Sequence, residues 1–174
     1  NNYSTWNTTR NATSANNIYT GFVDGTMAAY FATNPNNHYG INRLFTFFDT
    51  SSIPSEATII SAEIHLYAGP YQHGSNQIHI VGSWANLPLG VDDYSRLFFY
   101  SGGTFISPPP NSWIVIPLNS TGLSWIMKGS VTKFALINNF DLTNTAPTGQ
   151  NDMNISMGED TTNRPYLLVS YTLP

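Results

Sequence analysis

The carboxylates are the side chains of this chain best suited to chemistry, and ten of them are present. A glycosidase needs two carboxyl groups about 5–10 Å apart on either side of the scissile bond. Asp92 and Asp93 are neighbours in sequence, as are Glu159 and Asp160, so the two side chains of each pair diverge. The carboxylates therefore predict no acid–base pair. We expect no catalytic activity, and a polysaccharide lyase or hydrolase is the weaker alternative.

An oxygen-only Ca²⁺ site suits the acidic residues better, because Asp side chains and backbone carbonyl groups are the ligands that this ion prefers. Their spacing matches no EF-hand loop. The hypothesis is a structural Ca²⁺ ion, against the alternative that these carboxylates hold no ion. The candidate ligands are Asp24, Asp92, Asp93, Asp152, Glu159 and Asp160.

The other reactive side chains predict no site. The four histidines have no metal-ligand spacing, and we expect solvated strand histidines at positions 38, 65, 73 and 79. The chain has no cysteine, no Gly-x-Ser-x-Gly elbow and no phosphate-binding loop. Arg43 follows a strand pattern and is expected to pair with a carboxylate such as Asp49 or Glu159; the alternative is that it binds a ligand carboxylate.

Aromatic side chains are the remaining candidates, since sugar-binding modules stack pyranose rings on exposed Trp or Tyr. In an all-β domain most aromatic rings fill the core, which is the alternative for each of them. Trp125 is expected in the core from its phase in a short helix. The candidate sugar-stacking residues are Trp84, Trp113, Tyr71 and Tyr94.

Composition excludes several partners. The net charge is −4 with only six Lys and Arg, which are scattered, so nucleic-acid binding is not expected. No apolar run approaches the length of a membrane span. At 174 residues with 41% hydrophobic and 9% charged residues, the chain can bury one domain's core, and its Thr, Tyr, Phe, Ile and Val content favours β-structure.

Five Asn-x-Ser/Thr sequons and a first residue other than Met lead us to expect an extracellular or cell-surface protein after signal-peptide removal. The alternative is that a chain rich in Asn and Thr forms sequons by chance. The candidate glycosylation sites are Asn2, Asn7, Asn11, Asn119 and Asn154.

Hydrophobic alternation predicts the elements. Ala62, Ile64 and Leu66 face one side of a predicted strand, and the residues between them face the other. Strands are predicted at 18–23 and 27–33 on either side of an Asp24–Gly25 turn. About ten short strands broken by turn residues indicate an antiparallel β-sandwich at 18–174. The one helix expected lies within 120–129.

Three motifs carry a resemblance to a known family. They are Arg43-Leu44-x-x-Phe47-x-Asp49 followed by Ser52-Ile53-Pro54 and a Ser61-Ala62 strand; Trp125 with Lys128-Gly129; and Ser156-x-x-Glu159 followed by Arg164-Pro165-Tyr166. Together they resemble the DNRLRE domain family, a carbohydrate-binding-module-like β-sandwich of secreted bacterial and archaeal proteins, over roughly 18–173. The resemblance implies a jelly-roll-like sandwich. Members are attributed to polysaccharide binding or form parts of large surface proteins.

Residues 1–17 are a polar arm whose only large apolar side chains are Tyr3 and Trp6. Because the arm cannot bury enough apolar surface to fold alone, we expect it to add as an extended strand to a neighbouring subunit's sheet. Such addition does not close and builds a filament, tube or coat. The alternative is that the arm folds back on its own domain. The predicted function is a secreted, self-assembling structural subunit, and the alternative is a non-catalytic carbohydrate-binding module.

Overall fold

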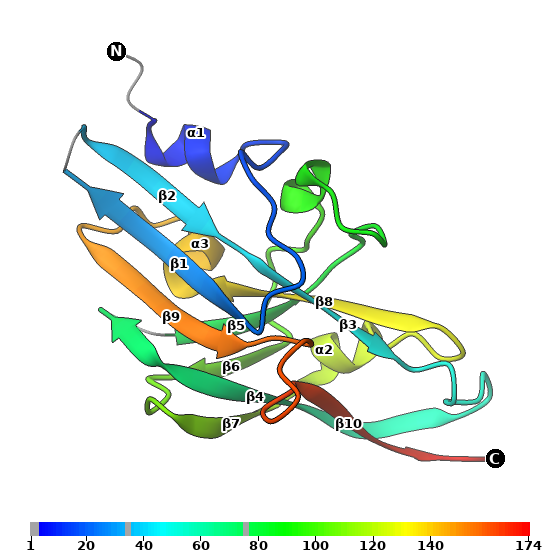
Figure 1. Ribbon diagram of the computed structural model, residues 1–174. Helices are drawn as coiled ribbons and strands as arrows, with labels where there is room; N and C mark the ends of the chain where they lie inside the picture. Colours follow the sequence, from blue (N-terminus) through cyan, green and yellow to red (C-terminus); the bar gives the residue numbers. More distant parts are fainter. Residues whose placement is uncertain (1–3, 34–35, 75–76) are drawn as a thin grey trace.

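The computed structural model describes residues 4–33, 36–74 and 77–174, which form an all-β sandwich of two antiparallel sheets (Figure 1). This confirms the predicted fold class. The first sheet contains β1 (Asp24–Ala32), β2 (His38–Asn42), β4 (Thr58–His73), β7 (Ser112–Pro117), β9 (Gln150–Ser156) and β10 (Tyr166–Thr172). The second sheet contains β3 (Leu44–Asp49), β5 (Gln77–Gly82), β6 (Gly103–Ile106) and β8 (Val131–Asn138).

The long strand β4 organises the first sheet. Along one edge it pairs with β7, as in Ile64 opposite Ile116. Along its other edge it pairs first with β10 and then with β9, so these two strands lie end to end. Beyond β9 follow β1 and then β2, which is the last strand on that side.

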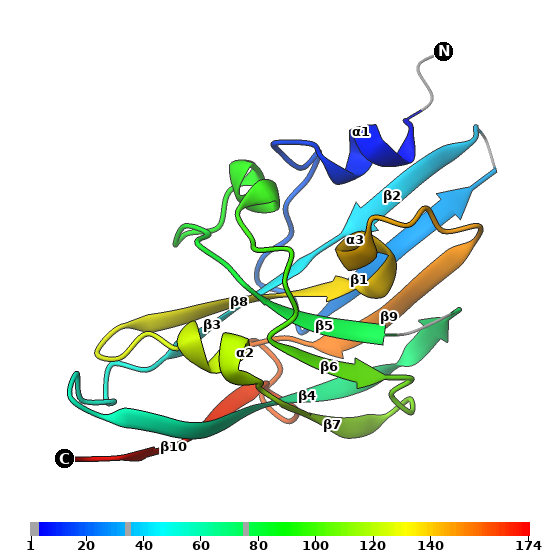
Figure 2. The same cartoon turned by 180° about the vertical axis from the view of Figure 1, so that it is seen from behind.

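The core lies between the sheets and follows the predicted alternation. Ile64 and Leu66 of β4 are fully buried, and they belong to one cluster with Ile80 of β5 and with Phe134 and Leu136 of β8. The second sheet also has a covered outer face, where Val81, Leu97, Ala135 and Ile137 form a smaller cluster. Figure 2 shows α3 (Asn139–Thr143) and the loop at 83–100 on that side, whereas Leu123 of α2 (Ser120–Ser124) packs against the core between the sheets.

Several elements differ from the sequence prediction. The described residues include three short α-helices, and α1 (Trp6–Arg10) lies in the segment predicted as an extended arm. Residues 18–23 form no strand, and Asp24–Gly25 begins β1 instead of making a turn. Only Arg43 separates β2 from β3, so the chain passes from one sheet to the other at this residue.

Candidate functional site

The N-terminal segment, residues 4–15, packs against its own sandwich beside β2 (Figure 1). Trp6 is only 7% exposed, and its ring meets Tyr39 of β2 edge-on at a centroid distance of 5.8 Å. Its indole N–H donates to the Asn144 side-chain oxygen at 3.1 Å. The prediction of an extended arm is therefore wrong for these residues, because Trp6 finds an apolar site on its own domain. Tyr3, the other predicted arm residue, lies outside the described residues.

Hydroxyl groups of this segment cover the open edge of β2. The Tyr39 backbone N–H donates to Ser4 Oγ at 3.3 Å, and the Tyr39 carbonyl accepts from Ser4 Oγ and from Thr9 Oγ1, each at 3.3 Å. Thr5 caps α1 by accepting from the Thr8 N–H at 3.2 Å. The segment thus protects a sheet edge with side chains, without adding a strand to it.

A buried ionic cluster fixes the base of the segment. Arg43 donates from Nε and Nη2 to the two Asp141 carboxylate oxygens at 2.7 and 2.9 Å. Its remaining donors reach the Tyr94 carbonyl at 2.8 Å and the Arg10 carbonyl at 3.0 Å. The Arg10 side chain donates in turn to the Asp141 carbonyl at 2.7 Å. The expectation that Arg43 pairs with a carboxylate is confirmed, but its partner is Asp141 and not Asp49 or Glu159.

Aromatic rings complete this cluster. The Arg43 guanidinium lies 4.0 Å from the Tyr94 ring centroid, and Arg10 lies 4.1 Å from that of Phe99. The Tyr94 hydroxyl donates to the Thr9 carbonyl at 3.0 Å. Burial raises the pKa of Tyr94 to about 12 and lowers the pKa of Arg10. Tyr94 is buried, so the prediction that its ring stacks on a sugar is wrong.

The linker, residues 16–23, differs sharply from the segment before it, because every one of its residues is exposed. Tyr19, Phe22 and Val23 are 75%, 57% and 58% exposed, and Ile18 is also exposed. Backbone hydrogen bonds hold its two ends, from the Ala15 N–H to the Val91 carbonyl and from the Met157 N–H to the Val23 carbonyl. Within the described chain, residues 16–22 make no hydrogen bond to the body of the domain.

A second candidate site is the outer face of β4, β7 and β10, where aromatic side chains gather. Tyr67 and Trp113 are cross-strand partners with ring centroids 5.7 Å apart. Tyr166 lies 5.8 Å from Trp113 and stacks on His65 at 4.2 Å. Trp113 and Tyr166 are 43% and 46% exposed. We call these four residues the aromatic row.

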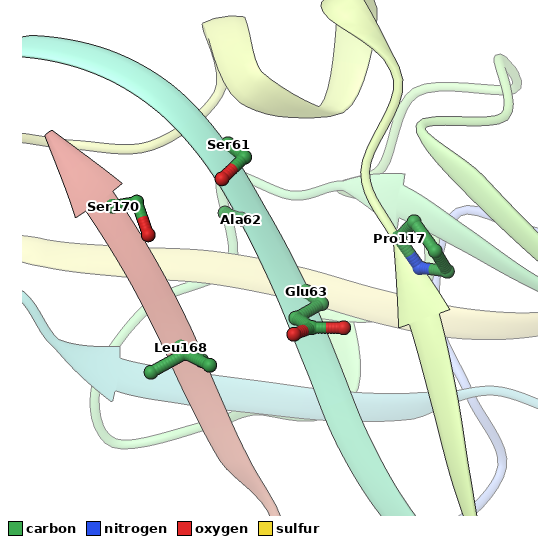
Figure 3. Close-up of a pocket in the computed structure, with 6 residues that line it drawn as sticks. All are labelled: Ser61, Ala62, Glu63, Pro117, Leu168 and Ser170. Atoms are coloured by element: carbon green, nitrogen blue, oxygen red, sulfur yellow. The ribbon is translucent and has the colours of Figure 1, made fainter.

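A shallow hollow of about 210 Å³ follows the aromatic row along the same face (Figure 3). Glu63 of β4 lies between Leu168 of β10 and Pro117 of β7, its cross-strand partners. The hollow is lined by Ser61, Ala62, Glu63, Pro117, Leu168 and Ser170. It offers one carboxylate and two hydroxyl groups beside apolar surface.

Only Trp113 among the predicted sugar-stacking residues belongs to the aromatic row. Trp84 is exposed and packs on Phe98 with centroids 4.7 Å apart, and Tyr71 is exposed towards the far end of β4. Neither has a ring contact with Trp113 among the described residues. The prediction missed Tyr67 and Tyr166, although the alternation of β4 already places Tyr67 on the solvent side.

The six predicted calcium ligands are not brought together. Across 4–33, 36–74 and 77–174, no three His, Cys, Asp or Glu side chains form a group that could hold an ion. Asp93 is buried and accepts from the Asn86 and Gly90 N–H groups at 2.9 and 2.7 Å. The Asp160 carboxylate accepts from the backbone of its own turn. Asp152 contacts His73 at 2.7 Å, and Asp24, Asp92 and Glu159 are exposed.

The histidine prediction is wrong at one position. His79 is buried, with Nδ1 3.0 Å from Ser101 Oγ and Nε2 3.2 Å from the Asn139 side-chain oxygen. Burial lowers the pKa of His79, so this side chain is neutral at pH 7. His79 supports the β5–β6 edge through these contacts, which include Thr104 Oγ1 at 3.0 Å.

The predicted glycosylation sites occupy different environments. Asn7 and Asn11 are exposed on and just after α1, whereas Asn2 lies outside the described residues. The Asn119 amide caps α2 and donates to the Ser101 carbonyl at 2.9 Å, so its nitrogen is engaged. Asn154 is half-buried within β9 and bonded to Thr26 Oγ1. The N-terminal positions are therefore the most accessible.

Comparison with known proteins assigns no family or function to the chain. A scan of protein-family models matches no family to the chain, and no curated protein matches its sequence. The resemblance to DNRLRE domains thus stays a prediction. None of the described helices is long and apolar enough to cross a membrane.

Proposed function

We propose that this chain is a secreted, non-catalytic structural subunit that associates with copies of itself through its N-terminal region. The observation that carries the proposal is the linker, residues 16–23, in which every residue is exposed and Ile18, Tyr19, Phe22 and Val23 present large apolar side chains to solvent. Contiguous exposed apolar surface of this kind marks an interaction site.

The linker also carries unused backbone groups next to its apolar side chains. Residues 16–22 make no hydrogen bond within the described chain, and they include the β-prone residues Ile18, Tyr19, Thr20 and Phe22. Burying the apolar side chains against another copy would contribute about 25 cal/mol per Å². The surface charge opposes association only weakly, because the net charge is −4 over 174 residues.

Sedimentation velocity and negative-stain electron microscopy test the proposal. We expect concentration-dependent assemblies from the unaltered chain and at least about tenfold weaker association for Tyr19→Ser with Phe22→Ser. The matched control is Tyr71→Ser with Tyr100→Ser, since these side chains are 66% and 67% exposed elsewhere on the molecule. An unaltered chain that stays monomeric at every concentration would overturn the proposal.

A second candidate function is polysaccharide binding, which the aromatic row favours. The rings of Tyr67, Trp113 and Tyr166 lie within 6 Å of a neighbour on an open face, and exposed rings offer apolar surface on which a sugar can stack. The three strands beneath it carry no Lys or Arg, and Glu63 is their one carboxylate. This charge pattern favours neutral sugars over anionic ones.

Affinity electrophoresis in gels containing neutral polysaccharides tests this second function. We expect retardation of the unaltered chain and at least about tenfold weaker binding for Trp113→Ala. Trp84→Ala is the matched control, because Trp84 is similarly exposed but lies outside the aromatic row. Equal retardation of the two variants would remove the aromatic row from consideration.

A further inference from the structure

We infer that the N-terminal segment is exchanged between copies: residues 4–15 of one copy dock on the β2 edge of the next. This inference rests on the proposed self-association and names the surface and the partner, a second copy of this chain. In this inference a short helix docks on the neighbouring copy, whereas the sequence prediction had the arm add a strand to the neighbour's sheet. Its starting point is the contrast between a well-docked segment and an unsupported linker.

The docking site belongs to the body of the domain. Trp6 contacts Tyr39 and Asn144, and Arg10 contacts Asp141, and none of these three partners lies in the segment itself. The hydroxyls of Ser4 and Thr9 likewise bond to the backbone of β2. A segment from another copy therefore satisfies every one of these groups in the same geometry.

The linker permits the exchange because the body holds only its last residue, through the hydrogen bond from the Met157 N–H to the Val23 carbonyl. Residues 16–22 have no hydrogen bond to the described body, and Gly21 adopts a left-handed φ of 75° within it. Extended, the linker's eight residues would span about 26 Å, enough to reach an adjacent copy of this size. Exchange thus changes the linker's path and leaves the docking contacts intact.

The difference between the two forms then lies in the linker. When the segment docks on its own body, Tyr19, Phe22 and Val23 remain in water. When it docks on another copy, two bodies are brought together around the linkers, and these side chains can be buried between them. One-way exchange leaves a free docking site at one end and a free segment at the other, so it extends into a filament.

Complementation between two full-length variants tests the exchange. We name each variant after the element that is altered in it. The donor variant, Trp6→Ala, has an altered segment, which loses the side chain that fills the docking site, and it keeps an intact docking site. The acceptor variant combines Tyr39→Ala with Asn144→Gly, which removes both partners of Trp6 while keeping the left-handed backbone at 144, where φ is 54°. Each variant alone is expected to associate at least about tenfold more weakly than the unaltered chain.

Mixing gives the decisive readout. The intact segment of the acceptor variant should occupy the intact site of the donor variant, so a 1:1 mixture yields heterodimers that stop at that size. Sedimentation of a mixture with one partner fluorescently labelled measures this. A mixture that contains only monomers, or variants that still form filaments alone, would overturn exchange while leaving self-association standing. If the unaltered chain is monomeric, both proposals fall.

A labelled peptide of residues 4–17 provides a second measurement that does not depend on the variants associating with one another. We expect the peptide to bind the donor variant, whose own segment docks weakly, at least about tenfold more tightly than the acceptor variant. Equal binding to both would show that the Tyr39–Asn144 surface does not receive the segment in trans. Cooperative thermal unfolding of each variant confirms that the bodies are folded.

Discussion

At the scale of single residues, the buried pair of Arg43 and Asp141 anchors the base of the N-terminal segment. The Asp141 carboxylate is fully buried and accepts two hydrogen bonds from Arg43, while Arg10 approaches it at 3.5 Å. Two guanidinium groups thus depend on one carboxylate. Removing this charge would leave a buried cation without compensation.

Asp141→Asn is therefore expected to lower the free energy of unfolding by about 3–5 kcal/mol, because breaking a buried pair strands its partner. Urea denaturation followed by tryptophan fluorescence measures the loss. Asp24→Asn, at an exposed position, is the matched control and should stay within about 0.5 kcal/mol. A loss below 1 kcal/mol for Asp141→Asn would show that the pair is not an anchor.

Tyr94 makes the stability of this region sensitive to alkaline pH. Burial raises its pKa from 10.0 to about 12, so the folded protein holds the phenol proton more tightly than the unfolded chain. This contribution to stability is complete below pH 10 and is lost as pH rises from 10 to about 12, by about 2–3 kcal/mol in total. We expect Tyr94→Phe to flatten the decline in unfolding free energy across that window. An unchanged slope would assign the decline to other groups.

The sequence predicted these residues only in part. A strand arginine flanked by apolar neighbours indicated an ion pair, but Asp141 lies 98 positions away and only the fold brings it near. Likewise, the alternation of β4 placed Tyr67 on the solvent side, whereas Tyr166 joins the aromatic row through strand pairing. Residue type and phase predict exposure, and topology decides the partners.

At the scale of elements, regular alternation was the reliable signal and isolated β-propensity was not. The predicted strand containing Ala62, Ile64 and Leu66 is present because each apolar side chain enters the core. Residues 18–23 have a similar composition but no neighbouring strand within the described chain, so they form none. Trp6 shows the converse, since its aromatic side chain packs a five-residue helix onto the domain together with the contacts of Ser4, Thr9 and Arg10.

The close approach of α2 to the turn before β6 gives a prediction at this scale. A Cβ atom on Gly122 would lie 2.3 Å from the Gly102 carbonyl oxygen, so the two backbones touch. Gly122→Ala should therefore lower stability by about 1–3 kcal/mol, measured as a fall in Tm. Gly158→Ala is the control because a Cβ there meets no atom within 4 Å. Equal Tm values for both variants would contradict this packing.

At the scale of the whole molecule, covered and uncovered surfaces are unevenly distributed. The outer face of the second sheet is covered by its own small cluster, and hydroxyl groups of the N-terminal segment cover the edge of β2. The linker, and the face of β4, β7 and β10, remain open to solvent. Both proposed functions use these surfaces, and composition alone predicted neither location.

Limited proteolysis with chymotrypsin probes the linker in the intact molecule. A protease needs several extended residues free of hydrogen bonds, and residues 16–22 meet that requirement within the described chain. We expect the first cuts after Tyr19 and Phe22, found by mass spectrometry. Tyr71 and Tyr100 are comparably exposed internal controls, but Tyr71 belongs to β4 and Tyr100 lies next to a turn bonded to β5.

In assemblies the linker cuts should slow at least about tenfold while cleavage at any other site keeps its rate, because the linkers are then buried between copies. First cuts after Tyr100 would show that the linker is not the segment most open to the protease. Linker cuts at the same rate in assemblies and monomers would show that association leaves the linker in water and that copies meet elsewhere.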